Sequence, residues 1–155
     1  MRDPSCFFVT KSLQPRRKAI SSDTARIISA AWTFYAEKGN VYLAAFVVML
    51  DHWHVLFAPA LDTTLAAQMQ RAGRWIGRQT KEAVGRRGCR WQDGYHDTRI
   101  RSSKQFLFVR NYIETNPIKA GLVESPEDWP WSSASPNYRE RLTDPWPWTF
   151  EQDRA

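Results

Sequence analysis

The sequence is poor in the features that mark secreted and membrane proteins. Its two cysteines, Cys6 and Cys89, lie far apart and form no Cys-x-x-Cys pair, so they read as reduced thiols in a reducing compartment. No apolar run approaches the length that crosses a bilayer, and the N-terminus lacks the basic-then-apolar form of a signal peptide. We therefore expect a cytoplasmic protein with no membrane partner.

Acidic residues are the minority charge. The 155 residues include 22 Lys or Arg against 16 Asp or Glu, which gives a net charge of +6 and a pI near 9.6. This balance favours a polyanionic partner, with nucleic acid first. A hydrophobic content of 43% and a charged content of 25% are ordinary for a globular chain, and the length fits one domain with a real core.

Periodicity and capping signals predict alternating strands and helices. We expect strands at 6–10, 41–50 and 52–59, and helices at 21–38, 65–84 and 104–116. The dipeptide Asp93-Gly94 predicts the turn of a hairpin between 89–93 and 95–101. Pro117 predicts that the last helix ends or bends at Asn116, and Gly121 is expected to finish a further turn. Antiparallel hairpins joined by long helices indicate an α+β fold, a sheet with helices packed mainly on one face.

The strand predicted at 52–59 begins with His-Trp-His. Residues i and i+2 of a strand point to the same face, so His52 and His54 look one way and Trp53 the other. Two imidazoles on one face can hold a divalent metal ion. The alternative is structural, because a buried histidine is often satisfied by a hydrogen bond alone.

Basic residues gather on the helix predicted at 65–84 and just after it. Arg71, Arg74, Arg78 and Lys81 are spaced to form one stripe, and between Arg71 and Arg90 there are seven basic residues against one acid. Charge runs of this kind are usually solvated faces, but here the alternating acids of such faces are missing. We interpret the stripe as a track for nucleic-acid phosphates. The residues assigned to this track are Arg71, Arg74, Arg78, Lys81, Arg86 and Arg87.

The helix predicted at 104–116 carries a second chemical candidate. Phe108, Tyr112 and Asn116 are spaced by four and share one ridge. An asparagine amide oxygen suits a hard cation such as Mg²⁺ or Mn²⁺. A phenol, with an ordinary pKa of about 10, needs help from a metal, a base or a polarised target to act as a nucleophile. Alternatively, Tyr112 is a core aromatic and Asn116 a helix C-cap.

In order along the chain, four blocks resemble one known family. His52-Trp53-His54 matches the HUH motif (histidine, hydrophobic, histidine), and residues 112–123 resemble the catalytic-tyrosine block of the IS200/IS605-type Y1 transposases. Residues 91–97 and 126–133 resemble further blocks, and the likeness spans about 5–134. The chain is most similar to the REP-associated tyrosine transposases. Leu50-Asp51 departs from the family, which usually has Pro followed by Asn or Asp there.

The resemblance implies both a fold and a mechanism. The fold is a ferredoxin-like sheet in a transposase domain at 1–134, followed by a Trp- and Pro-rich tail at 135–155. His52, His54 and Asn116 bind Mg²⁺ or Mn²⁺, and Tyr112 is the nucleophile that cuts and rejoins single-stranded or hairpin DNA through a 5′-phosphotyrosine link. Trp53 or Trp91 could stack on bases; the alternative for Trp53, which faces away from the metal, is a core position. His96 is a further candidate polar group at the site.

Two other functions fit the same residues. A non-catalytic hairpin-binding protein would keep the fold and the basic stripe, and a small metallohydrolase would use the histidines on water without forming an adduct. The sequence leaves open whether the protein is a monomer or a homodimer, and whether the active site forms within one chain.

Overall fold

The centre of the structure is a four-stranded antiparallel sheet. In the computed structural model, which describes residues 5–15, 19–84 and 91–154, the strands are β1 (Phe7–Ser12), β2 (Val41–Val48), β3 (His52–Pro59) and β4 (His96–Arg99). Their order across the sheet is β2-β3-β1-β4. Residues 16–18 and 85–90, which include Cys89, lie outside the described residues.

Strands β2 and β3 form the hairpin that the sequence predicts. Their near-continuous apolar composition is typical of strands buried on both faces, and almost every residue of both is buried. The turn at Leu50-Asp51 is closed by a 2.8 Å hydrogen bond from the Met49 amide to the His52 carbonyl. Because β3 is central, its two rows of side chains enter two separate hydrophobic clusters on opposite faces.

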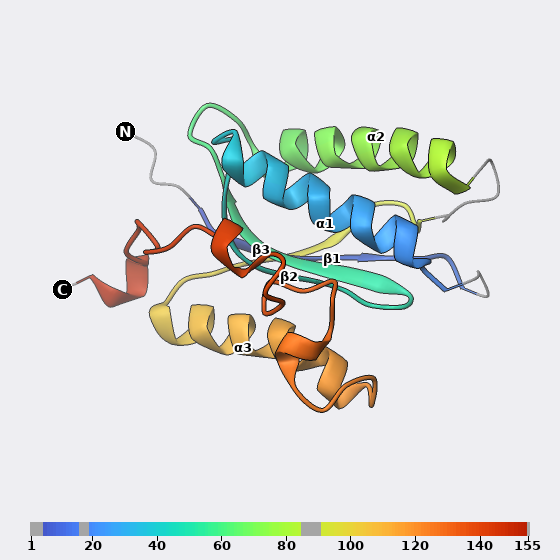
Figure 1. Ribbon diagram of the computed structural model, residues 1–155. Coiled ribbons are helices and arrows are strands. Elements are labelled where there is room, and N and C mark those ends of the chain that lie inside the picture. Colours follow the sequence, from blue (N-terminus) through green and yellow to red (C-terminus); the bar gives the residue numbers. More distant parts are fainter. Residues whose placement is uncertain (1–4, 16–18, 85–90, 155) are drawn as a thin grey trace.

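Two helices cover one face of the sheet, and the third covers the other (Figure 1). Helix α1 (Ser22–Glu37) begins at the predicted cap, where the Ser21 side chain accepts a hydrogen bond from the Thr24 amide. Helix α2 (Leu65–Val84) packs beside α1 through the predicted apolar stripe, of which Met69, Ala72 and Ile76 are buried. The expected α+β fold, with helices mainly on one face, is confirmed.

Helix α3 (Ser103–Lys119) is longer than predicted. Of the two alternatives, an end at Asn116 is wrong, because Pro117 lies inside the helix and is buried. Packing of the ring offsets the hydrogen bond that a proline cannot donate. The helix ends one turn later, where Ala120 is the C-cap and Gly121 adopts a left-handed φ of +73°. Asn116 is therefore a helical residue and not a C-cap.

The predicted hairpin around Asp93-Gly94 is also wrong. Strand β4 pairs with β1, His96 lying opposite Thr10, and Trp91 pairs with Leu13 of the same chain segment. The described parts of the two predicted arms therefore both pair with β1 or the residue after it, and they do not pair with each other. The residues between them form a bulge. Lys11 Nζ donates to the carbonyls of Gln92 and Gly94 at 2.7 and 2.6 Å, which satisfies the bulge from the partner strand.

The segment after α3 returns to the sheet. Ser132 pairs with Val47 at the β2 edge, and the Trp129 indole donates to the Val48 carbonyl at 2.9 Å. Beyond residue 134, Trp146 and Phe150 pack on Phe106 at the start of α3. This segment protects an otherwise unpaired sheet edge. No helix in the described part of the chain is both long and apolar enough to cross a membrane.

Candidate active site

The two histidines share the face of β3 that α3 covers. His54 is buried and His52 half-buried, with ring centroids 4.6 Å apart. Trp53 points the other way, as alternation predicts, and packs against Trp32 in the core under α1. Of the two alternatives for Trp53, the core position is confirmed and base stacking is wrong. Trp91 is half-buried and packs against the same core.

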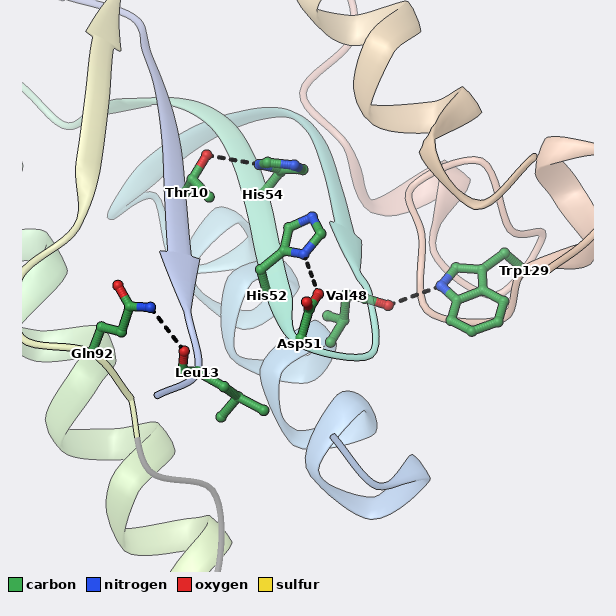
Figure 2. A network of polar contacts seen from close by, with 8 residues as sticks. All are labelled: Thr10, Leu13, Val48, Asp51, His52, His54, Gln92 and Trp129. Atoms are coloured by element: carbon green, nitrogen blue, oxygen red, sulfur yellow. Dashed lines mark hydrogen bonds and ion pairs between the residues drawn. The ribbon is translucent and has the colours of Figure 1, made fainter. Parts of the chain in front are cut away.

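Each imidazole is held through its Nδ1 atom (Figure 2). Thr10 Oγ1 lies 2.8 Å from His54 Nδ1, and Asp51 Oδ1 lies 2.6 Å from His52 Nδ1. A metal-binding histidine usually engages a hydroxyl, carboxylate or carbonyl through one nitrogen and the metal through the other. The Nε2 atom of His54 is buried and has no hydrogen-bond partner. An orphaned buried nitrogen is costly, so this atom fits a ligand that the protein itself does not supply.

Tyr112 meets the histidines across the interface between α3 and the sheet. Its ring centroid lies 5.7 Å from that of His54 and 6.0 Å from that of Phe8 on β1. The fold of a single chain therefore brings Tyr112 against His54 and Phe8. The Lys119 ammonium lies 5.0 Å from the centre of the Tyr112 ring. The Tyr112 ring thus contacts one imidazole, that of His54, and one cation.

Asn116 is one helical turn beyond Tyr112 on the same ridge and is half-buried. In the described part of the chain, no three His, Cys, Asp or Glu side chains are grouped so as to hold a metal ion. A metal site here needs a donor of another type beside the two imidazoles. Asn116 carries an amide oxygen on the ridge that Tyr112 occupies, and such an oxygen suits a hard divalent cation.

The basic stripe lies on the opposite face of the sheet. Arg71, Arg74, Arg78 and Lys81 are exposed on α2, and none has an acidic partner among the described residues. Three of them line a groove of about 540 Å³ with Ala67 and Gln70. Arg86 and Arg87 lie outside the described residues. The structure therefore separates the basic stripe from Tyr112 by the thickness of the sheet.

Comparison with known proteins assigns the family. The model for the family described as "Transposase IS200 like" matches residues 7–116, which include both histidines, Tyr112 and Asn116. The chain belongs to the IS200-like transposase family. It is 27% identical over 128 residues to the REP-associated tyrosine transposase of Escherichia coli (strain K12), which covers 82% of this chain and 74% of that one.

Solved structures agree with this assignment. The structure of a REP-associated tyrosine transposase bound to a REP hairpin matches with a TM-score of 0.66 and 26% identity, over 86% of this chain and 80% of that chain. A crystal structure from Deinococcus radiodurans shares the fold at 16% identity, with a TM-score of 0.55 over 74% of this chain and 92% of that one. The expected resemblance to the REP-associated tyrosine transposases is confirmed.

Sequence reasoning missed four residues that surround the candidate site of this IS200-like transposase: Phe8, Thr10, Asp51 and Lys119. Asp51 was noted only as part of an unusual turn, although a carboxylate directly before a candidate ligand could have been read as its support. Lys119 follows Tyr112 by seven residues, which returns it to the same helix face. Thr10 gave no signal, because only strand pairing brings it opposite His54.

Burial makes His54 a source of acid sensitivity. Desolvation first, and the neighbouring His52 second, lower the pKa of His54 to about 3 from its ordinary 6.5. The unfolded chain therefore binds a proton near pH 6.5 that the folded chain refuses until about pH 3. Stability is fully present above pH 6.5 and falls as the pH drops below it, by on the order of 2 kcal/mol at pH 5.

Denaturant unfolding at pH 7 and pH 5, in chelator, measures this effect. His54→Gln removes the titrating group, and we expect this variant to lose less stability than the wild type over the same interval. Equal losses in the two proteins would show that His54 titrates normally.

Proposed function

We propose that this protein cuts and rejoins single-stranded DNA next to hairpins, through a covalent link between Tyr112 and a 5′ phosphate. The observation that supports this most is the packing of the Tyr112 ring against His54, whose Nε2 is buried and unpartnered. A core tyrosine would need no such neighbour. A phenol beside a pair of imidazoles and a lysine is suited to attack on a phosphodiester.

The proposed reaction exchanges one phosphodiester for another. The Tyr112 oxygen attacks the scissile phosphorus, the bond from phosphorus to the 3′ oxygen breaks, and the phenol proton ends on that oxygen as a free 3′ hydroxyl. In the reverse direction a 3′ hydroxyl attacks the phosphotyrosine and restores the phenol. Because one ester bond replaces another, rejoining needs no external energy source.

The chain's own groups supply much of what this step needs. Phe8 and His54 hold the Tyr112 ring from two sides, and Lys119 can neutralise charge that builds on the phosphate. The Nε2 atoms of His52 and His54, with the Asn116 amide oxygen, would hold a divalent metal, Mg²⁺ or Mn²⁺. Such a metal polarises a phosphate oxygen as a Lewis acid. Asp51 and Thr10 keep the two imidazoles in one orientation.

A hairpin is the proposed partner because of the relative that binds one. The similar REP-associated transposase was solved bound to a REP hairpin. In this chain the exposed groove on α2 offers arginines in a row, which suits the phosphates of a paired stem. The stem and the scissile phosphate would then contact opposite faces of the sheet.

Replacing both Arg74 and Arg78 by alanine should weaken hairpin binding and flatten its salt dependence. Each lost phosphate contact removes roughly 0.7–0.9 from the slope of log K against log salt, so the pair removes about 1.5. Binding isotherms at several salt concentrations measure this slope. Arg26→Ala with Arg141→Ala removes two exposed arginines that already pair with acids, and this control should change the slope less. Equal slopes in both double variants would remove α2 from the interface.

The function itself is tested by a search for the adduct. Hairpin DNA with a single-stranded flank is incubated with the protein and Mn²⁺ and run on a denaturing gel. A band carrying label only from the strand on the 5′-phosphate side supports the proposal. Cleavage without adduct would indicate a metallohydrolase, and binding without cleavage would indicate a non-catalytic hairpin-binding protein.

A further inference from the structure

Helix α3 covers only half of its face of the sheet. It packs on β2 and β3 (Figure 1). All four residues of β4 are exposed. Register and alternation place Phe8 and Thr10 of β1, and His96 and Thr98 of β4, on this same face. We call these four residues the β1–β4 floor. It extends from the candidate site to the edge of the sheet.

The floor joins the candidate site without a break. His54, Thr10 and His96 are paired in one row across β3, β1 and β4, and Thr10 contacts the first of them. Phe8 in the next row contacts both His54 and Tyr112, with centroid distances of 5.1 and 6.0 Å. A chain that reaches Tyr112 along the sheet therefore passes over the β1–β4 floor.

The wall of this surface is a ridge of α3. Lys104, Phe108, Tyr112 and Asn116 follow one another at intervals of four residues. Phe108 is 71% exposed although it is one turn from Tyr112, whose ring faces β1 and β3. Leu107 is 55% exposed but lies off this ridge, since adjacent helical residues do not share a face.

The charges around the ridge favour a polyanion. Lys104 is the first residue of the ridge. The Lys119 ammonium, from the last turn of the helix, lies over the Tyr112 ring. Two acids near the start of α3 are already engaged, because Glu151 pairs with Arg99 and Arg101, and Asp153 accepts hydrogen bonds from Ser103. An exposed aromatic ring between cations is the arrangement on which bases of single-stranded nucleic acid stack.

We infer that the single-stranded flank of the DNA lies on the β1–β4 floor, and that Phe108 stacks on a base next to the phosphate that Tyr112 attacks. The inference rests on the proposed function, because it identifies the strand that Tyr112 would cut. The exposed Phe108 ring would then have a nucleobase as its partner, on a surface continuous with the candidate site.

The test compares two DNA probes with three variants. The probes are one hairpin with a single-stranded flank and the same hairpin without it, bound in chelator so that no cutting occurs. Phe108→Ala should weaken binding of the flanked hairpin about 10-fold and leave the blunt hairpin unchanged. Phe108→Trp, which keeps a ring, should bind like the wild type. Leu107→Ala, the matched exposed control on the same helix, should also bind like the wild type.

Three outcomes would overturn the inference: an unchanged affinity of Phe108→Ala for the flanked hairpin, an equal loss in Leu107→Ala, or an equal loss on both probes. The competing occupant of this face is a second copy of the chain, and light scattering of the free protein tests for it. A wild-type dimer that Phe108→Ala converts to a monomer would make this face a protein interface and would also overturn the inference. The adduct gel tests the proposed function separately. An adduct in the wild type with no flank effect at position 108 would refute the inference alone.

Discussion

Tyr112→Phe is expected to abolish the covalent protein–DNA adduct, with strand cleavage lower by at least about 1,000-fold. The substitution removes only the attacking oxygen. The ring that remains can keep its contacts with His54 and Phe8 and its place under the Lys119 ammonium. No other hydroxyl in the described part of the chain has these neighbours, so we expect no substitute nucleophile.

Binding separates this effect from a damaged fold. The affinity of Tyr112→Phe for the flanked hairpin should stay within about twofold of the wild type, since uncharged stacking and phosphate contacts are kept. Tyr138→Phe is the matched control, because Tyr138 packs against Phe46 in the core on the opposite face of the sheet. That variant should still form the adduct. Persistence of the adduct in Tyr112→Phe would assign the nucleophile to another residue.

Alanine at His52 or His54 is expected to lower Mn²⁺-dependent cleavage by about 100-fold or more, because each removes a proposed metal ligand. The same variants should lose Mn²⁺ binding in the absence of DNA, which electron paramagnetic resonance measures without any dependence on activity. Hairpin binding in chelator should remain, since the basic stripe lies on the other face.

The two histidine variants should differ in stability. His54 is 6% exposed and lies against Phe8 and Tyr112, so His54→Ala also leaves a cavity. His52 is half-buried at the start of β3, so His52→Ala should unfold at nearly the wild-type denaturant concentration. His52→Ala is therefore the cleaner probe of the metal. Full cleavage by His52→Ala in the presence of chelator would refute a metal-dependent mechanism.

Most elements could be predicted because their signals are local. The Ser21 cap begins α1 as expected, and the alternation around His52 and His54 correctly puts Trp53 in the core. The two errors arise where local signals compete with packing. Asp93-Gly94 is a strong turn dipeptide, but pairing with β1 turns it into a bulge. Pro117 disfavours a helix, but its buried ring and the cap at Ala120 keep the helix going past Asn116.

The candidate site was predictable in part for the same reason. Spacing along one strand shows that His52 and His54 share a face, and spacing along one helix shows the same for Tyr112 and Asn116. Spacing within an element says nothing of which residues from other elements meet them. Thr10 and Phe8 reach the site through strand pairing and the packing of α3, and neither could be identified beforehand.

By itself, the sequence determined the family, the α+β class and the residue types that can carry the chemistry, because periodicity, caps and short motifs are properties of neighbouring residues. Only the tertiary structure decided that Tyr112 and His54 meet, that the arginines of α2 lie on the opposite face of the sheet, and that α3 leaves β4 exposed. The physical reason is that these relations depend on strand order and on which face each helix covers. Both are set by the burial of apolar surface across the whole sheet and not by any local stretch.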